Sequence, residues 1–482
     1  MSNSLTTEVE VRERRLKSII SFAGKASELQ AGAVSQKKVE QPRCFSQCSD
    51  CAQMRAGTIC SHIRDAAVVV HSPMGCFANN PANDEINKSG SLGRGQKPFK
   101  TNVVCSNISE KETIYGGLKK LREAIDEAYK RFHPSAIFVQ SSCAAGIVGD
   151  DIESVADEKQ AEYGIPVVPV YCEGFKSKVW SSGFDAGYHA LLKRIVKEPE
   201  KKQPDLVNIF NFMGSDTFSE ILGKIGLRPN YLVPLADIDT IARMTEAACS
   251  TSICETLGTY ITDVLEKQYG VPHVHATAPY GIKWTDAWYR EVARLTGKSD
   301  IVEEVIAKEH ERIAPKLEEL RKELKGLRIY IYAGDSYAHN MASIASDLGI
   351  EIAGITTLHH DMKTDGEPVE HSSLQEMINV AGDIEHFSVC EKQPYEVIKI
   401  LKQVKPDVVI IRHMHLPALS AKLGIPSILE GEVNVSAGYD GIITLGERLK
   451  NIRKFKRVLT TLEEYNEFPY TKQWLEDERL FI

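Results

Sequence analysis

Short apolar runs alternate with longer amphipathic stretches along most of this chain. The apolar runs are four or five residues long and rich in β-branched residues, which is typical of strands buried on both faces. They are Ala67–Val70, Ala136–Val139, Val167–Tyr171, Leu206–Phe210, Ile329–Tyr332, Ile350–Gly354 and Val408–Ile411. Helical patterns follow most of them, as at Ile114–Lys130 and Ser219–Ile225. This alternation predicts an α/β protein with doubly wound parallel sheets.

The length of the chain sets the expected number of domains. A chain of 482 residues exceeds one ordinary core, since domains usually span roughly 100–200 residues. We expect three doubly wound, Rossmann-like domains at 41–200, 201–325 and 326–482, the last of which ends in a C-terminal tail. An N-terminal arm with a helical pattern, residues 1–40, precedes them. The charged stretch Val302–Leu324 predicts a helix that leads into the last domain.

Composition excludes several classes of protein. Hydrophobic residues make up 43% and charged residues 26% of the chain, as in ordinary globular proteins. The net charge of −8 gives no basic surface for nucleic acid. No run of about 18 apolar residues predicts a membrane span. The first residues are polar and form no signal peptide, so we expect a cytoplasmic protein that contacts neither membranes nor nucleic acid.

Eleven cysteines are many for a cytoplasmic protein, in which disulfides are rare. Cys44, Cys48 and Cys51 follow a C-x3-C-x2-C spacing that suits an iron–sulfur cluster. Radical-SAM enzymes use the same spacing, although on a barrel rather than on doubly wound sheets. Zinc is a further alternative, with Cys60 or His62 as the fourth ligand. Four other cysteines are expected to be buried thiols that act as small hydrophobes: Cys60, Cys172, Cys249 and Cys390.

Several polar residues follow predicted strands directly. Cys76 follows Val68–Val70 through a short turn, Cys143 follows the strand around Phe138, and Gly334-Asp335-Ser336 follows Ile329–Tyr332. Open parallel sheets bind ligands beyond the carboxyl ends of their strands. The pattern therefore predicts a buried cofactor that is held by loops from several domains.

Three cysteine motifs together resemble those of nitrogenase component 1. Residues 70–76 read Val-His-Ser-Pro-Met-Gly-Cys, which resembles the His-Gly-Pro-x-Gly-Cys turn of that family. Cys143 is followed by an Ile-x-Gly-Asp-Asp-Ile tail, and Cys51 has the family spacing before Cys76. Cys254 lies fifteen residues before Tyr269-Gly270-Val271-Pro272, which is the spacing of the family's cofactor cysteine. The resemblance spans most of the chain, except residues 1–40 and the tail after about Lys450.

The resemblance implies two metal sites around the core of the protein. Cys51, Cys76 and Cys143 would hold a P-cluster-like eight-iron, seven-sulfur cluster, shared with a homologous β-type (K-like) subunit in an α2β2 heterotetramer. Cys254 would anchor a large iron–sulfur cofactor related to the nitrogenase cofactor or its eight-iron precursor. The backbone of Gly334, Asp335 and Ser336 would approach that cofactor, unless these residues form an ordinary strand–helix turn. The resemblance also implies an ATP-hydrolysing iron-protein dimer as the electron donor. ATP would bind to that partner, since this chain has no phosphate loop.

This chain also departs from the family pattern. Molybdenum nitrogenase binds the far end of its cofactor with a histidine, but the loop Ser427–Asn434 here contains none. Trp180 and Phe184 stand where the family has a glutamine and a histidine, and an arginine is missing from Phe77–Asp84. These differences disfavour dinitrogen fixation. The candidates for the far-end ligand are Glu430, Glu432, His413, His415, His359 and His360.

Among the nitrogenase-like reductases that lack this histidine, the chain most resembles the methylthio-alkane reductase D subunit. That resemblance implies reductive carbon–sulfur cleavage of small thioethers. The alternative is a scaffold protein of nitrogenase cofactor maturation, which also keeps the cysteines and lacks the histidine. A true nitrogenase α subunit fits less well, because the loop Ser427–Asn434 lacks the histidine. The tetrapyrrole-reducing relatives also fit less well, because they lack the cofactor cysteine. Neighbouring genes of sulfur metabolism or of nitrogen fixation would discriminate the first two.

Overall fold

The computed structural model divides the chain into two compact units. Unit 1 comprises Met1–Arg15 and Asp50–His273, and unit 2 comprises Leu16–Ser49 and Val274–Ile482. The structure describes residues 5–35, 37, 39–41, 50–78, 84–365, 372–390, 393–412, 416–431, 435–468 and 471–473.

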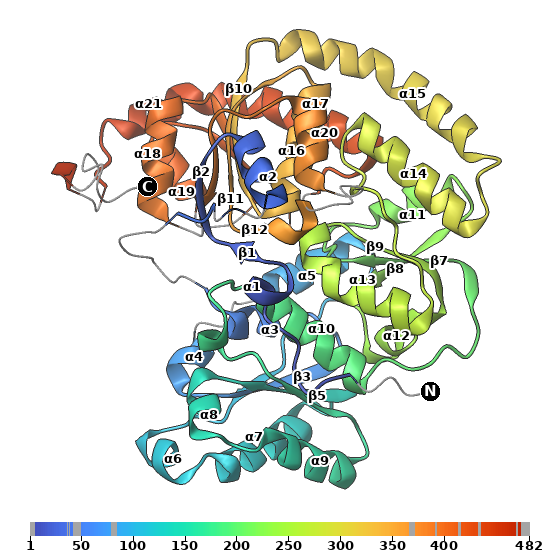
Figure 1. The fold of residues 1–482 in the computed structure, drawn as a ribbon, viewed down its shortest axis with the longest axis vertical. Coiled ribbons are helices and arrows are strands. Elements are labelled where there is room, and N and C mark those ends of the chain that lie inside the picture. Colours follow the sequence, from blue (N-terminus) through green and yellow to red (C-terminus); the bar gives the residue numbers. More distant parts are fainter. Residues whose placement is uncertain are drawn as a thin grey trace. The chain divides into compact units, whose positions relative to one another are not determined.

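A four-stranded parallel sheet, in the order β4-β3-β5-β6, forms the first part of unit 1. Its strands are β3 (Ala66–His71), β4 (Val103–Cys105), β5 (Ala136–Ser141) and β6 (Val167–Val170). Every residue of β3 and β5 is buried, as expected for strands covered on both faces. Helices α7 (Leu118–Phe132) and α9 (Ile152–Tyr163) cover one face, and α3 (Ala52–Ser61) and α10 (Ser182–Arg194) cover the other (Figure 1).

Because these strands are parallel and in register, their carboxyl ends meet at one edge. Val70 of β3 pairs with Cys105 of β4, and His71 pairs with Ser141 of β5. The loops that follow the three strands therefore leave the sheet side by side. The short helices at or after this edge are α4 (Met74–Ala78), α5 (Asp84–Gly93), α6 (Glu110–Tyr115) and α8 (Cys143–Val148).

A three-stranded parallel sheet, in the order β8-β7-β9, forms the rest of unit 1. Its strands are β7 (Gln203–Phe210), β8 (Arg228–Leu232) and β9 (Ala247–Ser252). The chain runs from β9 almost directly into helix α13 (Glu255–Tyr269), whose N-cap residue is Cys254. Helices α11 (Thr217–Gly223) and α12 (Ile238–Ala242) complete this part. The N-terminal helix α1 (Arg12–Arg15) also belongs to unit 1.

A six-stranded sheet, in the order β15-β14-β10-β11-β13-β2, forms the core of unit 2. Its parallel strands are β10 (Arg328–Ala333), β11 (Glu351–Thr357), β13 (Phe387–Cys390), β14 (Val408–Ile411) and β15 (Ser427–Leu429). The edge strand β2 (Ser21–Gly24) runs antiparallel to β13. A separate antiparallel pair joins β1 (Ser18–Ile19) to β12 (His360–Asp361).

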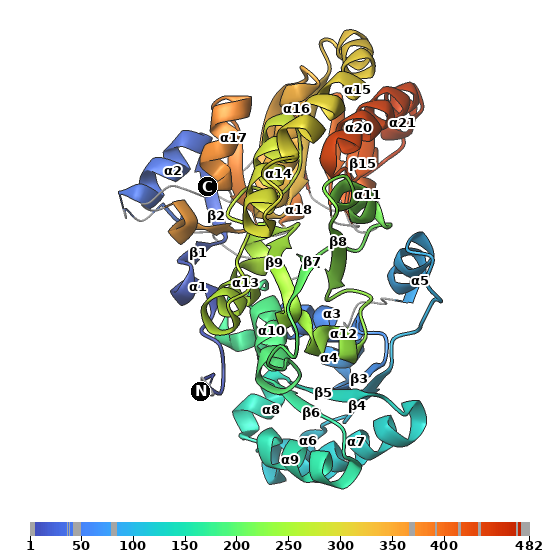
Figure 2. The same cartoon turned by 90° about the vertical axis from the view of Figure 1, so that its right-hand side faces the viewer.

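Helices cover both faces of the sheet of unit 2. Helices α2 (Ala26–Val34) and α17 (Ser373–Ala381) lie on one side of this unit, and α20 (Gly438–Ile452) and α21 (Lys456–Glu463) lie on the other (Figure 2). The remaining helices of the unit are α14 (Ile282–Thr296), α15 (Val302–Glu323), α16 (Asp335–Asp347), α18 (Pro394–Val404) and α19 (Leu416–Lys422).

The structure confirms the α/β class with parallel sheets and all seven predicted strands. Two predictions of helix are wrong in part. Residues 1–40 contain β1 and β2 between short helices, because residues 18–24 find strand partners late in the chain. The predicted helix Ile114–Lys130 is interrupted at Gly116, whose φ of 88° ends α6. The division into three domains at 41–200, 201–325 and 326–482 stays a prediction. No helix in the described ranges is long and apolar enough to cross a membrane.

Candidate metal-cluster sites

Three of the predicted cysteine ligands come together at the carboxyl edge of the four-stranded sheet. An ideal Cβ placed on Gly174 would lie 3.5 Å from the Sγ atoms of both Cys51 and Cys143. Cys76 follows the end of β3, which pairs with the end of β5. Burial, and then the thiols of Cys143 and Cys105, raise the pKa of the Cys76 thiol. All three are partly exposed rather than buried. The thiols therefore share one side of the sheet, where a partner could complete their ligand set.

Polar side chains hold the loops of this edge in place. The His71 ring lies 2.8 Å from Ser106 Oγ through Nδ1 and 2.9 Å from Asp150 Oδ2 through Nε2. The amide of Gly117 donates to Asp150 Oδ1 over 2.9 Å. Burial lowers the pKa of His71, although Asp150 acts in the opposite direction. His71 thus links the loop after β3, which carries Cys76, to the loops after β4 and β5.

Glycine at position 174 leaves room beside the thiols. A Cβ there would meet Cys51 Cβ at 3.1 Å, so any other residue would intrude on the space next to the two sulfurs. The neighbouring Glu173 accepts a hydrogen bond from Ser141 Oγ over 2.7 Å and pairs with Lys176 at 2.9 Å. The backbone around Gly174 is therefore fixed against the end of β5.

Cys105 is a fourth thiol at this edge, and the sequence predicts no role for it. It ends β4 and is partly exposed. Its Sγ lies 3.7 Å from Ser72 Oγ, in the turn that leads to Cys76. The signal that could have revealed it is the pair Val103-Val104, which makes Cys105 another polar residue at the end of an apolar run.

The donor set fits an iron–sulfur cluster better than a single ion. Cys51 and Cys143 lie beside Gly174, which has no side chain and so leaves space next to the two sulfurs. Thiolates beside such a space suit an iron–sulfur cluster, because it is a ligand of many atoms that binds thiolates. No three His, Cys, Asp or Glu side chains are grouped to hold one metal ion within the described ranges. Cys44 and Cys48, the other members of the sequence motif, lie outside those ranges. The structure confirms that Cys60, Cys172, Cys249 and Cys390 are buried.

Cys254 lies at a second place in unit 1, between β9 and α13. It is 4% exposed and caps a 15-residue helix, whose N-terminal end carries partial positive charge that stabilises a thiolate. Ser252 Oγ donates to the Cys254 carbonyl over 2.7 Å, and Asn211 Nδ2 donates to Ser252 Oγ over 2.9 Å. Tyr188 OH in turn donates to Asn211 Oδ1 over 2.6 Å. These bonds fix the position of the cysteine, which can supply one thiolate to a large cluster.

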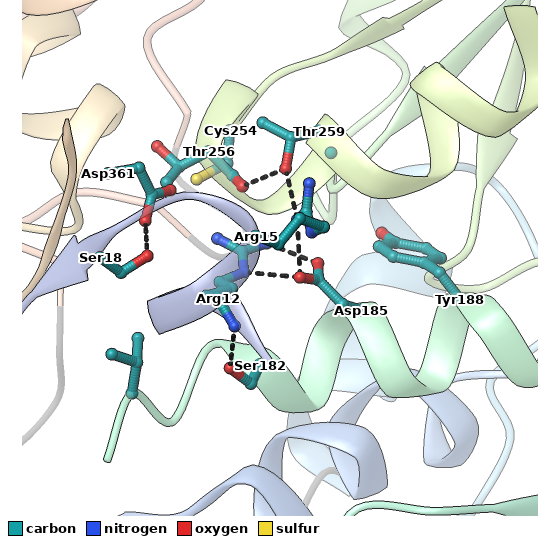
Figure 3. A network of polar contacts seen from close by, with 12 residues as sticks. Arg12, Arg15, Ser18, Ser182, Asp185, Tyr188, Cys254, Thr256, Thr259 and Asp361 are labelled. Carbon is teal, nitrogen blue, oxygen red and sulfur yellow. Dashed lines mark hydrogen bonds and ion pairs between the residues drawn. The ribbon is translucent and has the colours of Figure 1, made fainter. Parts of the chain in front are cut away.

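The N-terminal segment places two arginines near this second site. Arg12 forms two hydrogen bonds of 3.0 and 2.8 Å with the carboxylate of Asp185, and both side chains are fully buried. Arg15 adds a 2.7 Å contact to Asp185 and donates to Thr259 Oγ1 of α13 over 3.0 Å. Figure 3 shows both guanidinium groups converging on Asp185. Two guanidinium groups thus face one carboxylate beside α13.

Trp180 and Phe184 are both buried, 4% and 8% exposed. Their rings meet edge to face, with centroids 6.2 Å apart. The guanidinium of Arg55 lies 5.1 Å from the centre of the Trp180 ring. Trp180 and Phe184 thus form one packed, buried aromatic pair.

In unit 2, Gly334 is the N-cap of α16 at the carboxyl end of β10, and Asp335 and Ser336 form the first turn of that helix. The side chain of Asp335 faces His360, whose Nδ1 lies 3.0 Å from Asp335 Oδ1. His360 Nε2 contacts Asp365. Burial opposes both charges, but their mutual attraction holds the pKa of Asp335 at about 2 and raises that of His360 well above its ordinary value.

This network bears on the predicted far-end ligands. Both ring nitrogens of His360 are engaged by carboxylates, and His359 is buried beside it. Glu430 is fully buried, accepts a 2.7 Å hydrogen bond from the Ser436 amide and pairs with Arg448. Glu432, His413 and His415 lie outside the described residues. His360 and Glu430 are thus already committed to protein partners.

Comparisons with known proteins agree with this arrangement. The model of the family described as nitrogenase component 1 type oxidoreductase matches residues 51–453. The nitrogenase molybdenum-iron protein alpha chain of Methanosarcina barkeri is 33% identical over 318 residues, which are 63% of this chain and 59% of that protein. The nitrogenase iron-molybdenum cofactor biosynthesis protein NifE of Methanococcus maripaludis is 29% identical over 451 residues, 89% of each chain. The solved structure of nitrogenase Cp1 at pH 5 shares the fold, with a TM-score of 0.71, 22% identity, and coverage of 91% of this chain and 95% of that one.

Proposed function

Because the chain belongs to the nitrogenase component 1 type oxidoreductase family, we propose that it is the α-type subunit of a nitrogenase-like reductase. The observation that carries the proposal is that Cys51 and Cys143 meet beside Gly174, at the sheet edge to which β3 also leads Cys76. Cys254, buried at the N-terminus of α13, supplies a separate thiolate for the active-site cofactor. We also propose Gly334, Asp335 and Ser336, at the carboxyl end of β10 in unit 2, as cofactor-binding residues.

We propose two partners, a β-type subunit that follows from the ligand count and an electron donor that the family implies. Three thiolates cannot complete an eight-iron cluster, so a homologous β-type subunit supplies the rest of the ligands in an α2β2 assembly. An ATP-hydrolysing iron-protein dimer delivers the electrons. When bound, the clusters supply low-potential electrons, because thiolate ligation and burial set low potentials.

We propose small thioethers as the substrate class. Two electrons and two protons convert a methyl thioether into methanethiol and a hydrocarbon, with cleavage of one carbon–sulfur bond. The packed pair of Trp180 and Phe184 supports this assignment, because aromatic rings make favourable contacts with a thioether sulfur. The loop that lacks the family's histidine supports it as well.

One experiment tests the proposed function directly. The chain is purified anaerobically with its β-type partner, its iron is counted, and thioethers are added with the iron-protein donor and ATP. We expect release of methane from dimethyl sulfide, or of ethylene and water from a 2-hydroxyethyl methyl thioether, together with methanethiol in each case, and none without ATP. A complex that holds both clusters and turns over no thioether would contradict the substrate assignment alone. A complex without iron would contradict the family role as well.

A scaffold for cofactor maturation is the second candidate. The specific observation in its favour is the match to NifE, which is 29% identical over 89% of both chains, whereas the nitrogenase alpha chain of Methanothermobacter thermautotrophicus is 27% identical over 84% of this chain and 87% of that one. A scaffold would release its cofactor to an acceptor, whereas an enzyme retains it through turnover. Transfer of iron from the purified complex to a cofactor-free nitrogenase, without reduction of thioethers, would favour the scaffold.

A further inference from the structure

Cys105 reaches the cluster edge from a third parallel strand. It pairs with Val70 of β3 in the sheet register, whereas Cys143 follows β5 on the opposite side of β3. The carboxyl ends of β4, β3 and β5 thus lead to Cys105, Cys76 and Cys143 in spatial order. A fourth thiol at this edge follows from the pairing of the strands rather than from one side-chain position.

Hydrogen bonds fix the loop that carries Cys105 against the turn that carries Cys76. Ser106 N donates to Val70 O over 3.1 Å, and Ile108 N donates to Ser72 O over 2.9 Å. Ser72 N donates to Ser106 Oγ over 3.2 Å. The two loops therefore behave as one rigid piece, and the distance between their cysteines is set by the fold.

The environment of the Cys105 sulfur suits a metal ligand. The amide of Asn107 donates to Sγ over 3.3 Å, and the thiol itself donates to Ser72 O over 3.4 Å. Hydrogen bonds to the sulfurs are among the features that tune iron–sulfur clusters. The side chain is partly exposed, in contrast to the enclosed thiols of Cys60 and Cys172.

We propose that Cys105 is a fourth thiolate ligand, so that Cys51, Cys76, Cys105 and Cys143 form a complete four-cysteine set within this chain. Four cysteines are the usual ligand set of a four-iron, four-sulfide cluster. The chain would then hold such a cluster before any β-type partner binds. This inference rests on the proposed function only in that the other three cysteines bind iron.

The test uses the full chain, produced without a partner and reconstituted anaerobically with ferrous iron and sulfide. We expect about four irons per chain, with the electron paramagnetic resonance spectrum of a reduced four-iron cluster. Cys105→Ala should lose its iron to a chelator at least tenfold faster, since loss of even an outer-shell partner costs roughly 10–100-fold in affinity. Cys105→Ser preserves the size of the side chain and should retain iron with an altered spectrum. Cys249→Ala, a buried thiol of β9, is the matched control and should behave as the wild type.

The outcomes separate this inference from the proposed function. Identical iron retention and spectra in the wild type and both Cys105 variants would overturn the ligand assignment. A wild-type chain that binds iron only together with its partner would overturn the complete set and leave the proposed function intact. Absence of iron in both preparations would remove the cluster site itself. Circular dichroism of each variant distinguishes lost ligation from lost folding.

Discussion

Cys51 is the N-cap of α3, Cys76 lies in α4, and Cys143 is the first residue of α8. A methyl group cannot replace a thiolate–iron bond, so changing any one of them to Ala should lower the iron content of the complex and loosen its hold on the β-type partner. Iron analysis and gel filtration of the anaerobic complex measure both effects. Cys249→Ala removes a buried thiol from β9 and should change neither. Full iron in all three variants would refute the assignment.

Cys254 follows β9, which belongs to a different sheet from the strands that lead to Cys76 and Cys143. We predict that Cys254→Ala keeps the inter-subunit cluster and the partner complex but loses the second cluster and all substrate reduction. A buried thiol without a metal role would instead cost about 1 kcal/mol of stability and leave the iron count unchanged. Parallel iron and activity assays decide between the two, and near-normal turnover in the variant would exclude a cofactor role.

The sequence predicted only part of the chemistry at this scale. The buried thiols and the strand-end placement of Cys76 and Cys143 followed from apolar patterns and spacing. Cys105 was missed because the apolar run before it, Val103-Val104, is only two residues long and is a weak strand signal until the strand pairing is known. The commitment of Glu430 to Arg448 and Ser436 was equally invisible, because a carboxylate's partners depend on how the chain folds back.

Helix α1 is held to α10 by a buried ion pair. Changing Asp185 to Asn would leave Arg12 as an uncompensated buried charge, and breaking such a pair typically costs about 3–5 kcal/mol. We expect unit 1 to unfold at a lower concentration of denaturant, which the fluorescence of Trp180 can report. Asp205→Asn is the control, since its pair with Arg228 is about half exposed and should contribute at most about 1 kcal/mol. Equal effects of the two substitutions would contradict the role of the buried pair.

The turn from β10 into α16 depends on the charge of His360. Its pKa is raised above 6.5 by Asp335 and Asp365, against the effect of burial, so its full contribution to stability is present below pH 6.5. That contribution declines as the pH rises from 6.5 through the raised value, by up to about 1.4 kcal/mol per pH unit. We therefore predict that the free energy of unfolding falls above pH 6.5 and that His360→Gln removes this slope. The buried Trp284 and Trp288 of the same unit report the transition.

An exposed histidine serves as the control for that slope. His133 ends α7 in the left-handed conformation, which Asn tolerates, so His133→Asn keeps the local backbone. The pH dependence of the wild type should survive in this variant. A slope that is unchanged in His360→Gln would show that the imidazole between the two aspartates does not carry it.

Strands could be predicted from the sequence where a run of neighbouring apolar residues marks them. The seven strands are β-branched or apolar runs whose burial on both faces leaves a plain signature in the sequence. Residues 18–24 carry no such run, and they become strands only because Phe387–Cys390 and His360–Asp361 offer unpaired edges. No rule that reads neighbouring residues could anticipate partners so distant in the sequence.

For the whole molecule, we predict sensitivity to oxygen. The cysteines of the candidate cluster edge are partly exposed, and accessible thiolates and cluster edges oxidise readily. Purification in air should therefore remove visible absorbance and activity, whereas anaerobic preparations should be coloured. A protein that is colourless even under anaerobic conditions would count against clusters of any kind.

The edge strand β2 can pair with β13 only after most of the chain has been synthesised. Residues 21–24 leave the ribosome among the first, but their partners in β13 are residues 387–390. At roughly 5–20 residues per second, the first strand waits some tens of seconds for its neighbour. The four-stranded sheet of unit 1 lies wholly between these two segments in the sequence and can fold during the delay. The cysteine edge can thus be assembled on the nascent chain while the six-stranded sheet still lacks its last strands.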